Sequence, residues 1–195
     1  MTRVLIVSAH PAARSLTGQL ADRLAEVAGP DVERLDLYAR GFSPALTAAE
    51  RASTYADAFD TRDVADEIAQ LRRAEVLVLV FPTWWFGLPA ILKGWIDRVW
   101  APGHAYDHAS DLGPITGRLT GLRAVLVVTT LGAPAWVDWL VLRRPVRRVL
   151  RWGVVKVCAP QARFAFHALY AAEKVTPERL AGFEARVIRT LRRLL

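Results

Sequence analysis

Three almost unbroken apolar runs constrain the fold of this chain more than any other feature. They cover Val4–Ser8, Val76–Phe81 and Ala124–Thr130. A strand reads as continuous Val, Leu and Ile when helices cover both faces of its sheet. The runs therefore predict three central strands of a parallel sheet that is buried on both faces.

Segments of helical periodicity separate these strands. Apolar residues recur at helical spacing in 15–28, 63–73 and 88–100, and Thr176-Pro177-Glu178 predicts the start of a last helix that reaches Leu195. Weaker strand candidates are Val32–Leu37, and Val154–Ala159 running on toward Arg163. This alternation predicts a doubly wound α/β fold with five parallel strands in the flavodoxin-like order 2-1-3-4-5.

Composition fits one globular domain over residues 1–195, since 53% of the residues are hydrophobic and 23% are charged. The single cysteine, Cys158, excludes an internal disulfide, and its apolar surroundings predict an inert thiol in a buried strand. With 4 histidines and one cysteine we expect no catalytic metal site. No run is long enough for a membrane span or a signal peptide, so we expect a cytoplasmic protein.

In this strand order, ligands bind beyond the carboxyl ends of the central strands. The loop after the first strand leads into a helix N-terminus, where free amides and the helix dipole favour an anion. His10, Ser15 and Thr17 lie in this loop and the first helical turn. They predict a phosphate site, although Ser15 equally fits an ordinary helix cap.

The loop after the second central strand carries the strongest signal. It reads Phe81-Pro82-Thr83-Trp84-Trp85-Phe86-Gly87, with three consecutive aromatic residues where a buried strand ends. Aromatic faces flank flat heteroaromatic rings, and Thr83 and backbone amides can bond the polar edge of such a ring. By alternation alone, Trp84 is the most suited of the three to core or interface packing. After the third strand, Thr129, Thr130, Leu131 and Gly132 give a weaker signal for the other side of the ring.

These segments together resemble the NAD(P)H:quinone oxidoreductase family, which includes DT-diaphorase and modulator of drug activity B. Residues 81–99, FPTWWFGLPAILKGWIDRV, are similar to the family pattern Pro-x-x-Trp-Phe-Gly-x-Pro-Ala-x-x-Lys-Gly-Trp. His10-Pro11 followed by Ser15-Leu16-Thr17 is similar to the family's phosphate loop. The resemblance covers nearly the whole chain.

The resemblance implies a bound FAD, with FMN as the alternative, NAD(P)H as hydride donor, a quinone-like acceptor, ping-pong transfer and a homodimer with sites at its interface. By position, the phosphates would contact His10, Ser15, Leu16 and Thr17. The flavin ring would contact the loops after the second and third central strands, at Pro82, Thr83, Trp84, Trp85, Phe86, Thr129, Thr130, Leu131 and Gly132. The acceptor would contact Tyr106 and His108, contributed across the dimer, together with Trp136.

Two departures from the family bear on catalysis. Leu131 stands where the family usually has a glycine beside the flavin. Residues 135–139 lack the tyrosine and histidine that assist hydride transfer in the animal enzymes. We therefore assign no acid–base catalyst from the sequence.

Three other functions fit parts of the sequence. A flavodoxin-type electron carrier would have an acidic surface, which the formal net charge of +7 argues against. A flavin-binding ancillary protein of a membrane transporter fits the basic segment Arg143–Arg151, which predicts a basic amphipathic helix with weak contact to a membrane surface. Pro145 would interrupt this helix unless it lies near the helix start. A tailoring reductase acting on an aromatic polyketide would need the same flavin chemistry. No nucleic-acid motif accompanies the basic residues, so we expect no nucleic-acid partner.

Overall fold

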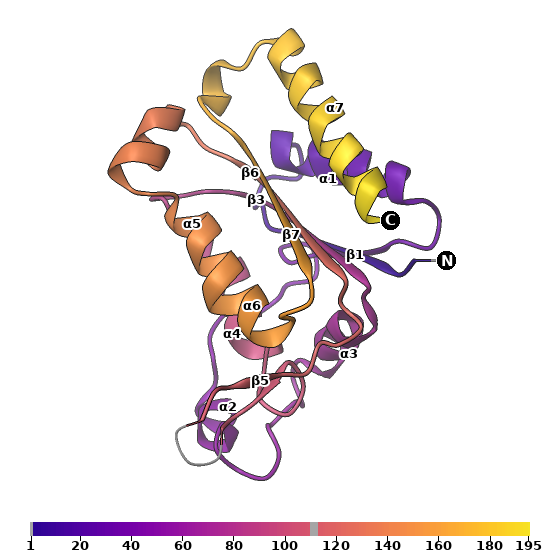
Figure 1. The fold of residues 1–195 in the computed structure, drawn as a ribbon, viewed down its shortest axis with the longest axis vertical. Helices are drawn as coiled ribbons and strands as arrows, with labels where there is room; N and C mark the ends of the chain where they lie inside the picture. Colours follow the sequence, from indigo (N-terminus) through magenta and orange to yellow (C-terminus); the bar gives the residue numbers. More distant parts are fainter. Residues whose placement is uncertain (1, 110–112) are drawn as a thin grey trace.

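The computed structural model describes residues 2–109 and 113–195, and its centre is a five-stranded parallel sheet (Figure 1). The strands are β1 (Val4–Ser8), β2 (Glu33–Asp36), β3 (Val76–Pro82), β6 (Ala124–Thr130) and β7 (Arg163–Leu169). Their order across the sheet is β2-β1-β3-β6-β7, and all four pairings are parallel. The predicted flavodoxin-like order is therefore confirmed.

Helices cover both faces of the sheet. On one face, α1 (Leu16–Ala28) and α7 (Pro177–Leu194) pack on alternate residues of the central strands, including Ile6, Val78 and Leu126. On the other face, α3 (Ala65–Arg73), α4 (Ala90–Val99) and the helical segment at 145–158 pack on the residues between them. This two-sided burial is why the central strands carry unbroken Val and Leu.

The fifth strand lies later in the chain than expected. Residues Val154–Cys158 are helical instead, as the end of a segment formed by α5 (Pro145–Arg148), the π-helical η2 (Val149–Val155) and α6 (Lys156–Cys158). Periodicity over such a short apolar run cannot separate a buried helix from a buried strand. The actual strand, β7, lies at the sheet edge and mixes Arg163 and His167 with its apolar residues, so its sequence signal is weak. Cys158 is buried as predicted, but in a helix.

A smaller lobe lies below the sheet in the view of Figure 1. It contains α2 (Ala48–Ser53) and the antiparallel pair β4 (Tyr106–Asp107) and β5 (Thr116–Gly117). Two further short elements complete the fold, the π-helical η1 (Val137–Val141) and the 3-10 turn η3 (Ala172–Lys174).

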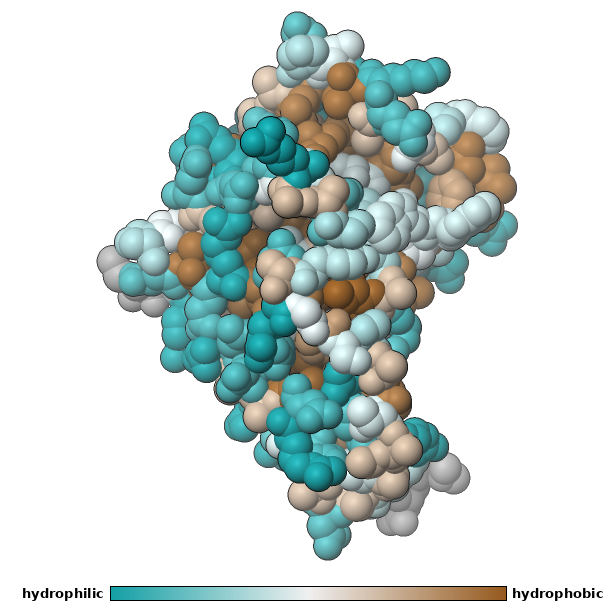
Figure 2. Space-filling view, turned by 180° about the vertical axis from the view of Figure 1, so that it is seen from behind, coloured by the Kyte–Doolittle hydropathy of each residue, from teal (hydrophilic) through white to brown (hydrophobic). Residues whose placement is uncertain are grey.

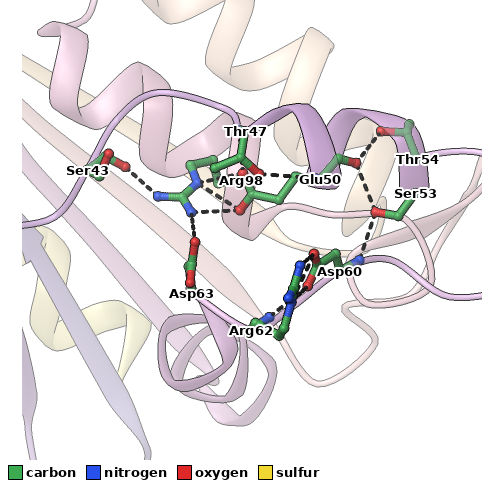
Figure 3. Close-up of polar contacts among 9 residues, drawn as sticks. All are labelled: Ser43, Thr47, Glu50, Ser53, Thr54, Asp60, Arg62, Asp63 and Arg98. Atoms are coloured by element: carbon green, nitrogen blue, oxygen red, sulfur yellow. Dashed lines mark hydrogen bonds and ion pairs between the residues drawn. The ribbon is translucent and has the colours of Figure 1, made fainter.

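A buried ion pair fastens this lobe to α4 (Figure 3). The Arg98 guanidinium donates to the Glu50 carboxylate through Nε, at 2.8 and 3.0 Å, and to the carbonyl oxygen of Ser43 through Nη1, at 2.6 Å. Both charged side chains are 3% exposed. Beside them Gly94 lies so close to Pro44 that an added Cβ would come within 2.1 Å of the Pro44 carbonyl oxygen. The segment before α2 therefore packs directly on the helix.

None of the helices in the described residues has the length and apolarity that crossing a bilayer requires.

Candidate functional site

A cavity of about 310 Å³ opens beyond the carboxyl ends of β3 and β6, where the strand order predicts a ligand. It is lined by Thr83, Trp84, Trp85, Phe86, Leu131, Gly132, Ala133 and Glu173. The structure thus brings together the loops after two separate strands, and six of the predicted flavin-binding residues meet in one place.

A strained turn shapes one wall of the cavity. Trp84 and Gly87 exchange backbone hydrogen bonds of 3.3 and 2.9 Å, which close a tight turn around Trp85 and Phe86. Both central residues have positive φ, 49° and 54°, as in a type I′ turn. This region disfavours side chains with a Cβ, so each residue costs about 1 kcal/mol or more. Such strain occurs where the local geometry serves a ligand.

The turn leaves its aromatic side chains and its amides accessible. Trp85 is 100% exposed and Trp84 is 42% exposed, so Trp84 does not lie in the core, and an interface role, the other outcome that alternation allowed, stays a prediction. Trp84 lies outside the core because the strand ends at Pro82 and the turn rotates the next side chains outward. Within residues 2–109 and 113–195, the N–H groups of Trp85 and Phe86 donate no hydrogen bond to the backbone. Two adjacent free donors therefore lie at the cavity.

The base of the cavity is well ordered by hydrogen bonds between the strand ends. The Thr83 amide donates to the Thr130 carbonyl at 2.8 Å, and the Thr83 and Thr129 hydroxyls are 2.8 Å apart. The amide of Leu131 donates to Leu169 at 2.9 Å and its side chain is buried. Leu131, which departs from the family pattern, therefore pairs through its backbone with the end of β7.

Gly132 and Glu173 form the opposite wall. A Cβ at Gly132 would lie 3.0 Å from Oε1 of Glu173, so the Glu173 carboxylate lies over the glycine. Sequence reasoning missed Glu173 because it belongs to η3, which follows the strand that was misplaced. It also missed Ala133, which carries no chemical signal. Glu173 is the acidic side chain that lines this cavity.

The first loop forms a helix N-terminus beside the aromatic turn. Ser15 caps α1, and its hydroxyl accepts the Gly18 amide at 3.0 Å. His10 Nδ1 accepts the Ala12 amide at 3.0 Å, and its ring centroid lies 6.3 Å from that of Trp84. Leu16 is half-buried, and Thr17 is buried and less accessible. A phosphate role for these residues stays a prediction that the helix terminus supports.

The predicted acceptor residues do not join this cavity in one chain. Tyr106 and His108 lie in the lower lobe, with ring centroids 5.3 Å apart, and His108 stacks on Tyr55 at 4.7 Å. His104 and His108 line a separate cavity of about 490 Å³ there. Trp136 is exposed near η1 and does not line the cavity at β3 and β6. Tyr106 pairs with Gly117 of β5, which Figure 1 places at the end of the molecule away from the upper ends of β3 and β6.

The cavity residues fit a flavin. A planar ring system needs an apolar face, donors for its carbonyl and nitrogen edge, and backbone close enough to touch it. Trp85 and Phe86 supply the aromatic face and the free amides, and Gly132, with the Glu173 carboxylate over it, supplies the opposite wall. The α1 N-terminus supplies amides suited to a phosphate.

The comparisons with known proteins agree with this fold and site. A family model described as a flavodoxin-like fold matches residues 2–186. The class of the protein is therefore that of the flavodoxin-like flavoprotein fold. The ribosyldihydronicotinamide dehydrogenase [quinone] of Pongo abelii is 33% identical over 193 residues, which cover 84% of this chain and 81% of the relative. This chain belongs to the NAD(P)H:quinone oxidoreductase family, as its sequence motifs predict.

One further relative and two solved structures also match this chain. The ribosyldihydronicotinamide dehydrogenase-like protein traD of Penicillium crustosum is 39% identical over 156 residues, or 67% of this chain, and the match spans only 58% of the length of that relative. The NAD(P)H:quinone oxidoreductase of Methanothermobacter marburgensis superposes with a TM-score of 0.82 at 25% identity, covering 99% of this chain and 96% of the other. An FMN-dependent NADH-azoreductase from Bacillus anthracis, solved with FMN, superposes with a TM-score of 0.76 over 99% of both chains. At 18% identity, this match shows a shared fold alone.

Proposed function

We propose that this chain is a flavin-dependent NAD(P)H oxidoreductase that reduces quinones or related small aromatic acceptors. The observation that carries the proposal is the turn at Trp85 and Phe86. There, two aromatic residues in left-handed backbone conformation, whose amides donate no backbone hydrogen bond within the described residues, line a cavity at the ends of β3 and β6. Family membership supports the same activity.

When bound, a flavin would accept a hydride from NAD(P)H and pass two electrons on to a quinone. The task of this chain is to hold and orient the reactants. Trp85 and Phe86 would face the ring, and their amides would donate to its polar edge, where negative charge develops on reduction. Thr83 is held in place by Thr129 and so can present its hydroxyl in a fixed direction. Close stacking supplies most of what hydride transfer requires.

Donor and acceptor would use the same open face in turn, which is a ping-pong scheme. A flavin ring would itself occupy the cavity of about 310 Å³, so donor and acceptor would share the one face of the ring that stays open. We propose that a second copy of the chain completes the acceptor site through its own Tyr106 and His108, since the lower lobe of one chain does not reach its own cavity. The homodimer predicted from the sequence thus remains part of the proposal.

FMN is the cofactor to test first and FAD is the alternative. Together, the residues at the cavity and at the α1 N-terminus suit a ring and one phosphate, which are the parts of FMN. The protein should be purified and denatured by heat, and the mass of any released chromophore should be measured. A released flavin supports the proposal, and its mass identifies the form.

A matched pair of variants tests the site itself. Phe86→Gly should lower flavin affinity at least about fivefold, because a stacked aromatic face contributes about 1–3 kcal/mol. Tyr38→Ser removes an exposed aromatic side chain beyond the end of β2 and should leave affinity unchanged. A protein that binds neither FMN nor FAD at micromolar concentration would refute the proposed function.

A further inference from the structure

The cavity at the ends of β3 and β6 has one charged wall. Among the described residues, eight line this cavity, and Glu173 is the one that carries a charge. Most of its neighbours there are apolar, including Trp84, Trp85, Phe86 and Leu131. Figure 2, seen from behind, shows apolar side chains gathered at the upper end of the molecule, where these strands end. The carboxylate is therefore the distinguishing chemical group of the cavity.

The backbone fixes the turn that carries Glu173. Ala171, just before η3, has a left-handed conformation with φ of 49°, which is uncommon for a residue with a Cβ. Its amide donates to the Ala133 carbonyl at 3.1 Å, and the Ala172 amide donates to the Leu131 carbonyl at 2.9 Å. Because these bonds tie η3 to the loop after β6, Glu173 belongs to the cavity wall.

Gly132 makes room for the Glu173 carboxylate. An added Cβ would lie 3.0 Å from Oε1 of Glu173, which is closer than side-chain atoms usually approach. The φ of Gly132 is not positive, so its backbone conformation is open to any residue. What the glycine provides is therefore space above the loop, and the carboxylate takes it.

No cation neutralises this carboxylate. Within residues 2–109 and 113–195, Glu173 forms no ion pair. The residue is exposed, so water can solvate it while the cavity is open. A ring that covers the cavity removes this water, and an acceptor that loses water without gaining a donor costs free energy. A ligand that brings its own N–H group is therefore favoured.

The polar edge of a flavin ring has this group. Its C2 and C4 carbonyl oxygens accept hydrogen bonds, and the N3–H between them donates one. The two walls of the cavity hold the matching set. Trp85 and Phe86 have amides that donate no hydrogen bond to the backbone of the described residues, and Glu173 has an acceptor.

We propose that the Glu173 carboxylate accepts the N3–H of the bound flavin and, through its charge, favours the oxidised over the reduced form of the ring. This role rests on the proposed flavin-dependent function. Reduction places negative charge on the ring, and a nearby carboxylate repels that charge. A flavin held beside Glu173 is therefore a stronger reductant toward a quinone than a flavin held beside a neutral side chain.

Flavin binding by the purified full chain in both oxidation states tests the role of the charge. The ligand is FMN or FAD, whichever binds more tightly, and its dissociation constants are measured under anaerobic conditions. Glu173→Gln keeps the size and an acceptor oxygen but removes the charge. It should raise the affinity for reduced relative to oxidised flavin about tenfold, the order expected for one charge across a partly hydrated cavity. For a two-electron couple this equals a rise of about 30 mV in midpoint potential.

The matched control is Glu26→Gln. It also removes one exposed carboxylate, but from the last turn of α1, at the opposite end of that helix from Ser15. The net charge changes by the same amount in both variants. Glu26→Gln should therefore leave the ratio of the two affinities unchanged.

A flavin methylated at N3 tests the hydrogen bond separately. It should bind the unchanged protein at least about tenfold more weakly than the parent flavin, because a hydrogen bond to a charged group is lost. Glu173→Ala should bind both flavins with equal affinity. A variant that merely loosened η3 would weaken both flavins alike and keep the difference between them.

The outcomes separate this role from the proposed function. If the protein binds flavin but Glu173→Gln shifts the ratio no more than Glu26→Gln does, the role of Glu173 is wrong and the proposed function stands. The same holds if Glu173→Ala still discriminates against the methylated flavin. If the unchanged protein binds neither FMN nor FAD, both proposals are refuted.

Discussion

The buried pair between Arg98 and Glu50 offers a sharp test of how the lower lobe is held. In Arg98→Met, the Glu50 carboxylate loses a guanidinium that contacts it at 2.7, 2.8 and 3.0 Å and keeps only its bonds within the α2 capping box. Removing one partner of a buried pair leaves an uncompensated charge, which costs about 3–5 kcal/mol. That is a large share of the stability of an ordinary domain.

Urea unfolding followed by far-UV circular dichroism measures this loss. The matched control is Lys93→Met on the same helix, because Lys93 pairs with Asp97 at the surface, with 55% and 42% of the two side chains exposed. That variant should lose less than about 1 kcal/mol. Adding Glu50→Leu to Arg98→Met should recover part of the loss, since neither charge is then left alone.

The pair also predicts a dependence on pH. Burial raises the pKa of Glu50, but hydrogen bonds from Arg98 and Thr47 outweigh it and hold the pKa below its usual 4.5. The stabilisation is therefore present above pH 4.5 and is lost as the pH falls through the lowered value. Arg98→Met should flatten this acid dependence. If it unfolds at the same urea concentration as Lys93→Met, the buried pair does not fasten the lobe.

Three further outcomes are expected. Gly94→Ala should destabilise the fold by about 2 kcal/mol or more, because its Cβ would overlap Pro44, whereas Gly121→Ala meets open space; equal urea midpoints would contradict this. Burial raises the pKa of Cys158 to about 12, so a disulfide reagent should label the native thiol at least about a hundredfold more slowly than the unfolded thiol. Fast labelling of the native protein would show that the structure around Cys158 opens. Burial and then Arg186 hold the pKa of His167 below 6.5, so stability should fall as the pH drops below 6.5, and His167→Gln should reduce that slope in thermal melts; an unchanged slope would exclude His167 as its source.

The sequence was informative where burial on both faces left a strong pattern. The runs containing Ile6, Val78 and Leu126 identified the central strands because nothing polar is tolerated there. The aromatic turn was recognisable as a site by its composition. Its backbone was not, since left-handed conformation at Trp85 and Phe86 is imposed by the turn and disfavoured by the residues themselves.

The remaining differences come from tertiary contacts. Val154–Ala159 is apolar enough for either a strand or a helix, and packing of the preceding helical turns on the sheet selects the helix. Glu173 enters the cavity only because β7 ends nearby. The arginine spacing at 143–151 fits one helix, but the chain reverses at Arg143 and Arg144, and only the folded backbone reveals this.

The turn at Trp85 and Phe86 has a consequence for directed evolution. Asparagine and glycine adopt this backbone shape at a lower cost than tryptophan and phenylalanine, so selection for heat resistance alone is expected to enrich Asn and Gly at positions 85 and 86. Such variants would be more stable and would bind flavin more weakly. A mutant library selected for flavin binding as well as for stability should therefore leave residues 85 and 86 unchanged.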